Sequence, residues 1–247
     1  SATTPKVLII VPAYNEGDSI ADVLADVRTH LPDSDVVVID DGSADNTAAA
    51  ARAVGATVLQ MPFNLGVGGA MQTGYLYASQ RGYDVAVQLD GDGQHPAEEA
   101  RRLVEEIGRQ EVDLLIGSRM GPDNDYRFPF MRRVGIGLIA AIVWLVSGRR
   151  IADPTSGFRA SSRRMMRFFA RHYPQSYLGD TVEAMVMAAR HGMRIGQTPV
   201  RMRPATHSSI RPIRGIFHTV CICLAILIDR LERPFPDYPS DSKEGDS

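Results

Sequence analysis

Val87-Gln-Leu-Asp-Gly-Asp-Gly-Gln-His-Pro96 is the stretch around which the rest of this chain is organised. An apolar run, Val85 to Leu89, leads into two carboxylates one residue apart, Asp90 and Asp92, and Gln94 follows. Carboxylates spaced i and i+2 on an extended backbone point to the same side. At the end of a buried strand, such a pair can hold Mg²⁺ or Mn²⁺ against the negative charge of a diphosphate. An Asp-Gly turn that only ends the strand is the alternative interpretation.

On both sides of this stretch, buried apolar runs alternate with segments of helical spacing. Strands are expected in residues 6–12, 36–41, 57–61, 82–89, 112–118 and 193–202, with a short strand after the loop 151–159. Helices are expected between them, including residues 96–110, 134–146, 163–171 and 181–191. This alternation predicts an α/β fold, with a doubly wound, mostly parallel sheet and helices on both faces.

Polar residues follow nearly every expected strand. Ligands of such sheets bind beyond the carboxyl ends of the strands. We therefore expect Tyr14, Asp41, Gly68 and Asp90 to converge there, although they are far apart in sequence. The glycine-rich loop 64–70 follows the third strand and lacks the Gly-x-Gly-x-x-Gly spacing, so it does not indicate a dinucleotide site.

The charges of the chain are unevenly distributed. The formal net charge of the 247 residues is only −2, so a nucleic-acid partner is not expected. Residues 119–214, however, contain 17 arginines and 5 acidic residues, a local net charge of +12. This excess predicts that the second half of the chain meets phosphates or an anionic surface, and a solvated basic face is the alternative.

Five motifs occur here in the order seen in family 2 glycosyltransferases. They are Ile10-Val-Pro-Ala-Tyr-Asn-Glu16, Asp40-Asp-Gly-Ser-Ala-Asp-Asn-Thr47, Asn64-Leu-Gly66, Asp90-Gly-Asp-Gly-Gln-His-Pro96 and Asp153-Pro-Thr-Ser-Gly-Phe-Arg159. The chain most closely resembles the polyprenyl-phosphate branch, which is similar to dolichyl-phosphate mannose synthase, over roughly Lys6 to Ile210. The resemblance implies a GT-A fold, a nucleotide-sugar donor, a divalent metal and transfer with inversion.

The resemblance also implies roles for individual residues. Those expected to hold the nucleotide sugar are Pro12, Tyr14, Glu16, Asp41, Gly68, Asp90 and Arg203, with Tyr14 facing the base and Arg203 at the diphosphate. Those expected to hold Mg²⁺ or Mn²⁺ on the diphosphate are Asp90, Asp92 and Gln94. Those expected to bind the acceptor phosphate are Arg119, Arg132 and Arg133. The expected catalytic residues are Asp92, Arg119 and Asp153.

The implied reaction moves a sugar from a UDP- or GDP-sugar to a polyprenyl monophosphate. That acceptor is already anionic near neutral pH, so catalysis would depend on the metal and on positioning by arginine. A hydroxyl acceptor is the alternative, and it would need a base, Asp153 or Glu183. A third alternative is a non-catalytic module that binds nucleotide sugars or a membrane surface. Two smaller questions stay open: Asp153 could instead cap its loop, and Arg119 could pair with Asp123 or Asp125.

The expected organisation is a single catalytic domain over residues 1–232. It comprises a nucleotide-binding half (about 6–118), an acceptor half (about 119–215) and a C-terminal helix (about 216–232), followed by a polar, disordered tail (233–247).

The expected location is the cytoplasm, peripherally at the inner face of the cell membrane. The two cysteines, Cys221 and Cys223, lie in an apolar run, which favours a reducing compartment over a disulfide framework. The apolar stretches Val134 to Val146 and Ile216 to Ile228 are both shorter than the roughly 20 residues of a spanning helix. The membrane surface and a separate membrane protein are therefore expected partners besides donor and acceptor.

Overall fold

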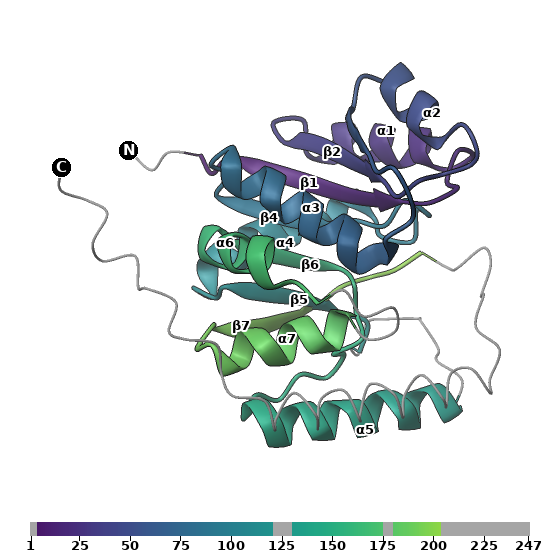
Figure 1. The fold of residues 1–247 in the computed structure, drawn as a ribbon. Helices are drawn as coiled ribbons and strands as arrows, with labels where there is room; N and C mark the ends of the chain where they lie inside the picture. The colour runs from purple at the N-terminus through teal and green to yellow at the C-terminus, as the bar shows by residue number, and fades with distance from the viewer. Residues whose placement is uncertain (1–3, 121–129, 175–179, 204–247) are drawn as a thin grey trace.

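The computed structural model describes residues 4–120, 130–174 and 180–203. Its seven-stranded sheet has the order β3-β2-β1-β4-β6-β5-β7 (Figure 1). The strands are β1 (Val7–Ala13), β2 (Asp35–Asp40), β3 (Thr57–Gln60), β4 (Val85–Gln88), β5 (Leu114–Ser118), β6 (Arg159–Ser162) and β7 (Ile195–Pro199). All pair in parallel except β6, which runs antiparallel to both of its neighbours. The predicted α/β fold with a mostly parallel sheet is confirmed.

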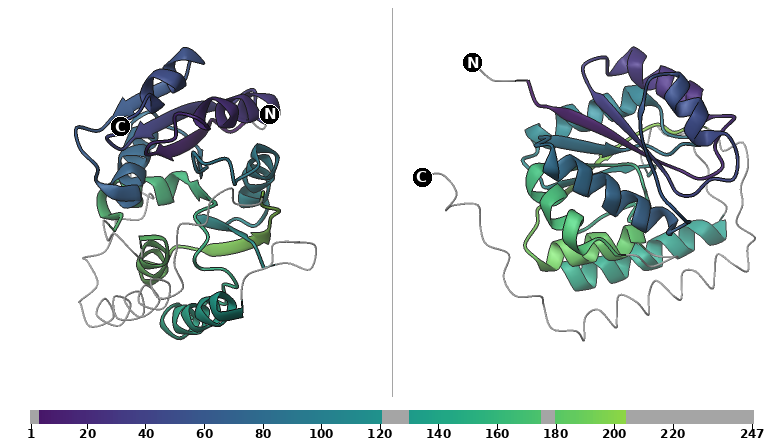
Figure 2. Two further views of the ribbon diagram at one scale, coloured as in Figure 1. Left: turned by 90° about the vertical axis from the view of Figure 1, so that its right-hand side faces the viewer. Right: turned by 45° about the horizontal axis from the view of Figure 1, so that its top comes forward.

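Helices cover both faces of the sheet, as the views in Figure 2 show. They are α1 (Ile20–His30), α2 (Thr47–Ala53), α3 (Gly66–Gln80), α4 (Ala97–Arg109), α5 (Phe130–Ser147), α6 (Arg163–His172) and α7 (Asp180–Arg190). Side chains that alternate along β1 point to opposite faces of the sheet, so each face needs helices to cover it. Leu8 and Ile10 belong to the core under α3, α6 and α7, whereas Ile9 and Val11 belong to the core under α1, α2 and α4.

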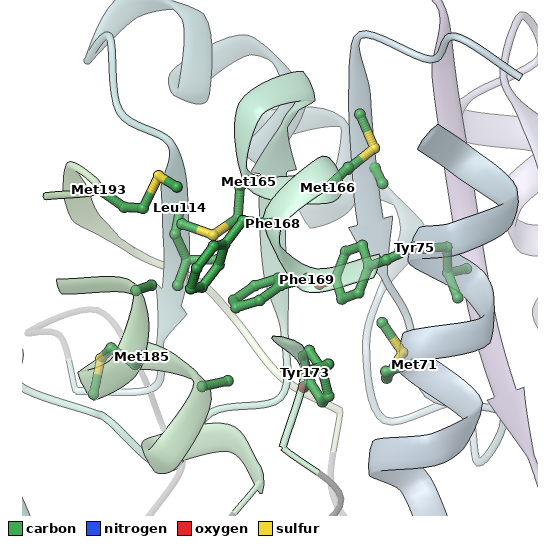
Figure 3. Packing of buried hydrophobic residues seen from close by; sticks show 14 of the residues in the cluster. Met71, Tyr75, Leu114, Met165, Met166, Phe168, Phe169, Tyr173, Met185 and Met193 are labelled. Atoms are coloured by element: carbon green, nitrogen blue, oxygen red, sulfur yellow. The ribbon is translucent and has the colours of Figure 1, made fainter. Parts of the chain in front are cut away.

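The first of these cores is rich in aromatic and sulfur-containing side chains (Figure 3). Tyr75 of α3 lies 5.1 Å from Phe169 of α6, centroid to centroid, and Phe169 meets Tyr173 edge-on at 5.0 Å. Met165 and Met166 are fully buried among them. The apolar side chains of α6 are therefore core residues that hold α6 against α3.

The insertion of β6 between β4 and β5 determines where the loop before it lies. Arg159 pairs in register with Gln88 of β4 on one side and with Ile116 of β5 on the other. Because β6 is antiparallel, it begins where β4 and β5 end. The segment Asp153–Phe158 is thus delivered to the carboxyl ends of both strands.

Some expectations lie outside the described residues. They are Asp123 and Asp125, the C-terminal helix 216–232 and the tail 233–247. Among the helices that the structure describes, none is long and apolar enough to cross a membrane.

Candidate active site

Three acidic side chains meet at the carboxyl ends of β1 and β4. Gly91, between Asp90 and Asp92, lies against the end of β1: a Cβ placed there would be 3.4 Å from Glu16 Cγ. The Ser19 hydroxyl lies 2.8 Å from the Gly91 carbonyl oxygen and 2.9 Å from Glu16 Oε2. Ser19 precedes α1, but its side chain does not cap that helix and instead joins the two strand ends.

The electrostatics of Glu16 show that these acids interact. Burial raises the pKa of Glu16 above its ordinary value, and the charges of Asp92, Asp45 and Asp90 raise it further. The hydrogen bond with Ser19 opposes these effects without cancelling them. Glu16, Asp90 and Asp92 therefore form a locus of negative charge that a bound cation would stabilise.

The donor atoms of this locus fit a hard divalent cation. Gln94 donates to both carboxylate oxygens of Asp92, from its backbone nitrogen (2.9 Å to Oδ1) and from its side-chain amide. Over the described part of the chain, no three His, Cys, Asp or Glu side chains form a ready metal cluster. Mg²⁺ is commonly bound by one or two carboxylates together with substrate phosphates, so a two-carboxylate site that a diphosphate completes matches this chemistry.

Both ring nitrogens of His95 lie close to Asp90, a contact that the sequence did not predict. Its Nδ1 accepts the Asp90 backbone N–H at 3.1 Å, and its Nε2 lies 3.6 Å from Asp90 Oδ2. The ring is 5% exposed and stacks on Phe158 at 4.6 Å. Gln88 donates to Asp90 Oδ1 at 3.2 Å. Asp90 is thus oriented by Gln88 of β4 and by His95 of the turn that follows it, whose ring stacks on the residue before β6.

The second group of acids, at the end of β2, organises the neighbouring loop. Asp41 accepts the backbone N–H groups of Leu65 and Gly66, both at 2.8 Å. Burial raises the pKa of Asp41 above its ordinary value, and these two hydrogen bonds oppose that increase without cancelling it. Both oxygens of Asp41 thus hold the start of α3, where Gly66 has a φ of +78° that favours glycine. The expected contact of Asp41 with base or ribose stays a prediction.

The other residues expected at the nucleotide lie near the same edge. Tyr14 follows β1 and is 50% exposed, whereas Pro12 is half-buried within β1. Gly68 is buried in the first turn of α3. Asp40 was not singled out as a site residue, yet it is fully buried and its Oδ2 has no hydrogen-bond partner among the described residues.

Arg119 and Asp153 form a buried ion pair beyond the end of β5. Arg119 Nε lies 2.7 Å from Asp153 Oδ2, and Nη2 lies 2.9 Å from Oδ1 and 2.9 Å from Thr155 Oγ1. The Asp153 side chain is 0% exposed and that of Arg119 is 12% exposed. Burial alone would raise the pKa of Asp153, but the hydrogen bonds and charge of Arg119 outweigh it, and this pKa is lowered.

This pairing bears on the role expected for Asp153. Both of its oxygens already accept hydrogen bonds, and a carboxylate with a lowered pKa is a weak base. The arrangement favours the loop-capping and positioning alternative over proton abstraction. Glu183, the other candidate base, is half-buried on α7.

The remaining arginines are less concentrated than the sequence implied. The backbone N–H of Arg203 donates to Gln94 O at 3.0 Å, so the segment after β7 borders the turn that carries Asp90 and Asp92. The Arg203 guanidinium, however, pairs with Asp26 of α1 at 3.0 Å, and Asp26 does not belong to the acid cluster of Glu16, Asp90 and Asp92. Arg133 is exposed in the first turn of α5, and the Arg132 side chain lies outside the described structure.

The fold and this edge define a class of protein. A mostly parallel sheet with an Asp-x-Asp turn at the end of β4 is the arrangement of nucleotide-sugar transferases of the GT-A type. Residues 8–173 match the family described as Glycosyl transferase family 2. The chain belongs to this family and is a glycosyltransferase.

Relatives and solved structures agree with this assignment. The chain is 34% identical over 202 residues to an undecaprenyl-phosphate mannosyltransferase of Micrococcus luteus, covering 79% of this chain and 82% of that protein. It is 32% identical over 170 residues to a polyprenol monophosphomannose synthase of Mycolicibacterium smegmatis, covering 66% and 64%. The structure resembles glucosyl-3-phosphoglycerate synthase of Mycobacterium tuberculosis in complex with UDP, with a TM-score of 0.69, 22% identity, and coverage of 94% and 82%. At that identity the likeness concerns the fold alone.

Proposed function

We propose that this glycosyltransferase moves a sugar from a UDP- or GDP-sugar to a polyprenyl monophosphate, with a divalent cation and with inversion. The observation that carries the proposal is the meeting of two sites at one sheet edge. The acid cluster of Glu16, Asp90 and Asp92 lies at the ends of β1 and β4, and Arg119 lies beyond β5, held by Asp153. One site suits a metal-bound diphosphate, and the other suits an anionic acceptor.

The acceptor explains why no strong base is required. An oxygen of the phosphate monoester attacks the anomeric carbon as the bond to the nucleoside diphosphate breaks. A single displacement of this kind inverts the configuration at that carbon. Mg²⁺ or Mn²⁺, held by Asp90 and Asp92, would neutralise the leaving diphosphate. Gln94 orients Asp92 for this task, and His95 orients Asp90.

Arg119 is assigned to the acceptor phosphate because its guanidinium is fixed in place. Asp153 and Thr155 hold Nε and Nη2, so little side-chain entropy remains to be lost on binding. A guanidinium is always charged, so Arg119 can attract an anionic phosphate even while one edge of the group is paired with Asp153. The similarity to an undecaprenyl-phosphate mannosyltransferase and to a polyprenol monophosphomannose synthase supports the same acceptor class.

A hydroxyl acceptor remains the second candidate, with Asp153 or Glu183 as base. The lowered pKa of Asp153 speaks against that residue as the base, so this candidate rests mainly on Glu183. Location follows from the acceptor: we propose peripheral attachment at the cytoplasmic face of the cell membrane.

The direct experiment offers UDP- and GDP-sugars with Mn²⁺ or Mg²⁺ to the enzyme, with a short polyprenyl phosphate or a saccharide as acceptor. Mass spectrometry should detect a polyprenyl phosphosugar. Transfer only to the saccharide hydroxyl would reject the phosphate acceptor and select the second candidate.

Arg119→Lys tests the assigned role of Arg119. It keeps a positive charge beside Asp153 but loses the guanidinium that Asp153 and Thr155 hold in place, so KM for the polyprenyl phosphate should rise at least about tenfold, the scale of one charge-assisted hydrogen bond. Slow hydrolysis of the donor by water should change far less. Arg101→Lys, in an exposed pair with Glu105 on α4, is the matched control. Equal losses in transfer and hydrolysis would mean that Arg119 serves the donor or the fold.

A further inference from the structure

α5 presents apolar side chains on two opposite sides. Its inner side is buried: Ile136 is 4% exposed, Ile139 3% and Val143 0%. These side chains hold α5 against the body of the protein, next to α7 in Figure 1. The outer side carries five exposed large apolar residues, which we call the α5 stripe: Phe130 (77%), Val134 (52%), Leu138 (52%), Trp144 (48%) and Leu145 (69%).

The spacing of the α5 stripe makes it one continuous surface. Phe130, Val134 and Leu138 follow one another at four-residue intervals, and Leu145 comes seven residues after Leu138. Such intervals place side chains on the same side of a helix. Exposed Ala141 lies between them and leaves no polar side chain in the middle of the stripe.

The concentration of apolar surface on α5 is unusual within this molecule. Ten large hydrophobic residues are exposed over the described ranges, and five of them lie on this helix. Contiguous apolar surface on a soluble domain marks a contact surface more often than isolated apolar residues do.

The charge around the α5 stripe indicates the chemistry of its partner. From Arg127 to Arg150 the sequence contains five arginines and no acidic residue. Arg133 is exposed in the first turn of α5, and the guanidinium of Arg150 lies 5.1 Å from the centre of the Trp144 ring. Tryptophan and arginine side chains with apolar neighbours are typical of helices that lie at a membrane–water interface.

We propose that the α5 stripe docks the enzyme on an anionic lipid bilayer, with the five apolar side chains in the interface and the arginines at the headgroups. Because the inner side of α5 stays in the core, only the outer side enters the lipid. This inference deepens the proposed function and rests on it for its biological purpose, since a polyprenyl phosphate is presented at such a surface. Only ten residues of sequence, 120–129, separate Arg119 of the assigned phosphate site from Phe130 of the stripe.

The protein contains its own reporter for this contact. Trp144 is the sole tryptophan of the chain and belongs to the stripe. Mixing the purified protein with vesicles of phosphatidylcholine and phosphatidylglycerol in equal amounts should shift its emission to shorter wavelength. Brominated phosphatidylcholine in the vesicles should quench that emission. Unchanged emission together with no co-sedimentation at low salt would overturn the proposal.

Paired variants assign the binding to α5. The double variant Leu138→Glu, Leu145→Glu should lower the vesicle partition coefficient at least about tenfold. Leu76→Glu is the matched control, because Leu76 is a helical leucine with 45% exposure on α3. The control should bind as the wild type does. Equal loss in both variants, or none in the double variant, would refute the assignment to α5.

Two further measurements distinguish docking on lipid from dimerisation of the protein and from failure of the proposed function. Light scattering without lipid should show the same mass for the wild type and the double variant. A wild-type dimer that the double variant abolishes would mean that a second copy covers the stripe, and would overturn the proposal. Transfer to a short, water-soluble polyprenyl phosphate should survive in the double variant. If the wild type binds vesicles but never transfers to that acceptor, the proposed function fails and the docking surface stands.

Discussion

Asp153→Asn is the change that best tests how this site is held together. It keeps the shape of the side chain and removes the negative charge that faces Arg119. In the structure the two charges are buried and joined by contacts of 2.7 and 2.9 Å. Removing one charge of a buried pair costs about 3–5 kcal/mol, because the other charge is left without compensation. The asparagine carbonyl can still accept one hydrogen bond, so we expect the lower end, about 3 kcal/mol at pH 7.

The pH dependence of this loss has a definite sign. The pKa of Asp153 is lowered from its ordinary 3.8 in the folded protein, so its ionised form contributes stability above that value. This contribution is lost as the pH falls through the folded-state pKa. The difference in unfolding free energy between wild type and Asp153→Asn should therefore be complete at pH 7 and should shrink only below about pH 4.

Urea unfolding followed by far-ultraviolet circular dichroism measures this difference. The control is Arg119→Met with Asp153→Leu, which replaces both charges by apolar groups and should recover most of the stability. The reasoning fails if Asp153→Asn costs less than about 1 kcal/mol, below the range for breaking a buried pair. It also fails if the difference is unchanged at low pH. Loss of transfer at unchanged stability would instead support Asp153 as a general base for a hydroxyl acceptor.

Three further predictions concern the metal site and the packing of the sheet. Asp92→Asn should nearly abolish turnover while the melting temperature stays within about 3 °C, because asparagine keeps an acceptor oxygen for the Gln94 backbone and removes a like charge beside Glu16; activity within about threefold of wild type would contradict the metal assignment. His95→Ala should weaken Mn²⁺ binding about 10–100-fold by calorimetry, because Asp90 loses its support; unchanged affinity would make His95 a packing residue. Gly74→Ala should destabilise the protein by about 1–3 kcal/mol, because its Cβ would lie 2.4 Å from a buried isoleucine of β1. Gly108→Ala on α4 meets nothing within 4 Å and should be neutral or stabilising, and equal effects would disprove the packing argument.

The strands that carry the site were predictable because their signal is local. β1 and β4 are buried on both faces of the sheet, so each is a nearly continuous apolar run. The polar residues that follow them must lie at the same edge, because the strands are parallel. The position of Asp90 and Asp92 near Glu16 therefore followed from pattern alone.

The pairings within the site were not predictable, because they join residues with no shared local pattern. From the sequence, Asp153 is either a base or a loop cap, and Arg119 is expected at the acceptor phosphate, with a pair to Asp123 or Asp125 as the alternative. In the structure Arg119 pairs with Asp153, since β6 runs antiparallel between β4 and β5 and carries the loop before it to the end of β5. Arg203 similarly meets Asp26, far away in the sequence.

What the sequence by itself determined is the class of fold, the edge of the sheet that carries the chemistry, and the family to which the chain belongs. Apolar periodicity and short motifs suffice for these, because each depends on neighbours along the chain. Only the tertiary structure decided which charges are paired and which side of α5 is exposed. Burial and ion pairing depend on the packing of distant segments: Ile139 and Leu138 are adjacent apolar residues, yet one is 3% exposed and the other 52%.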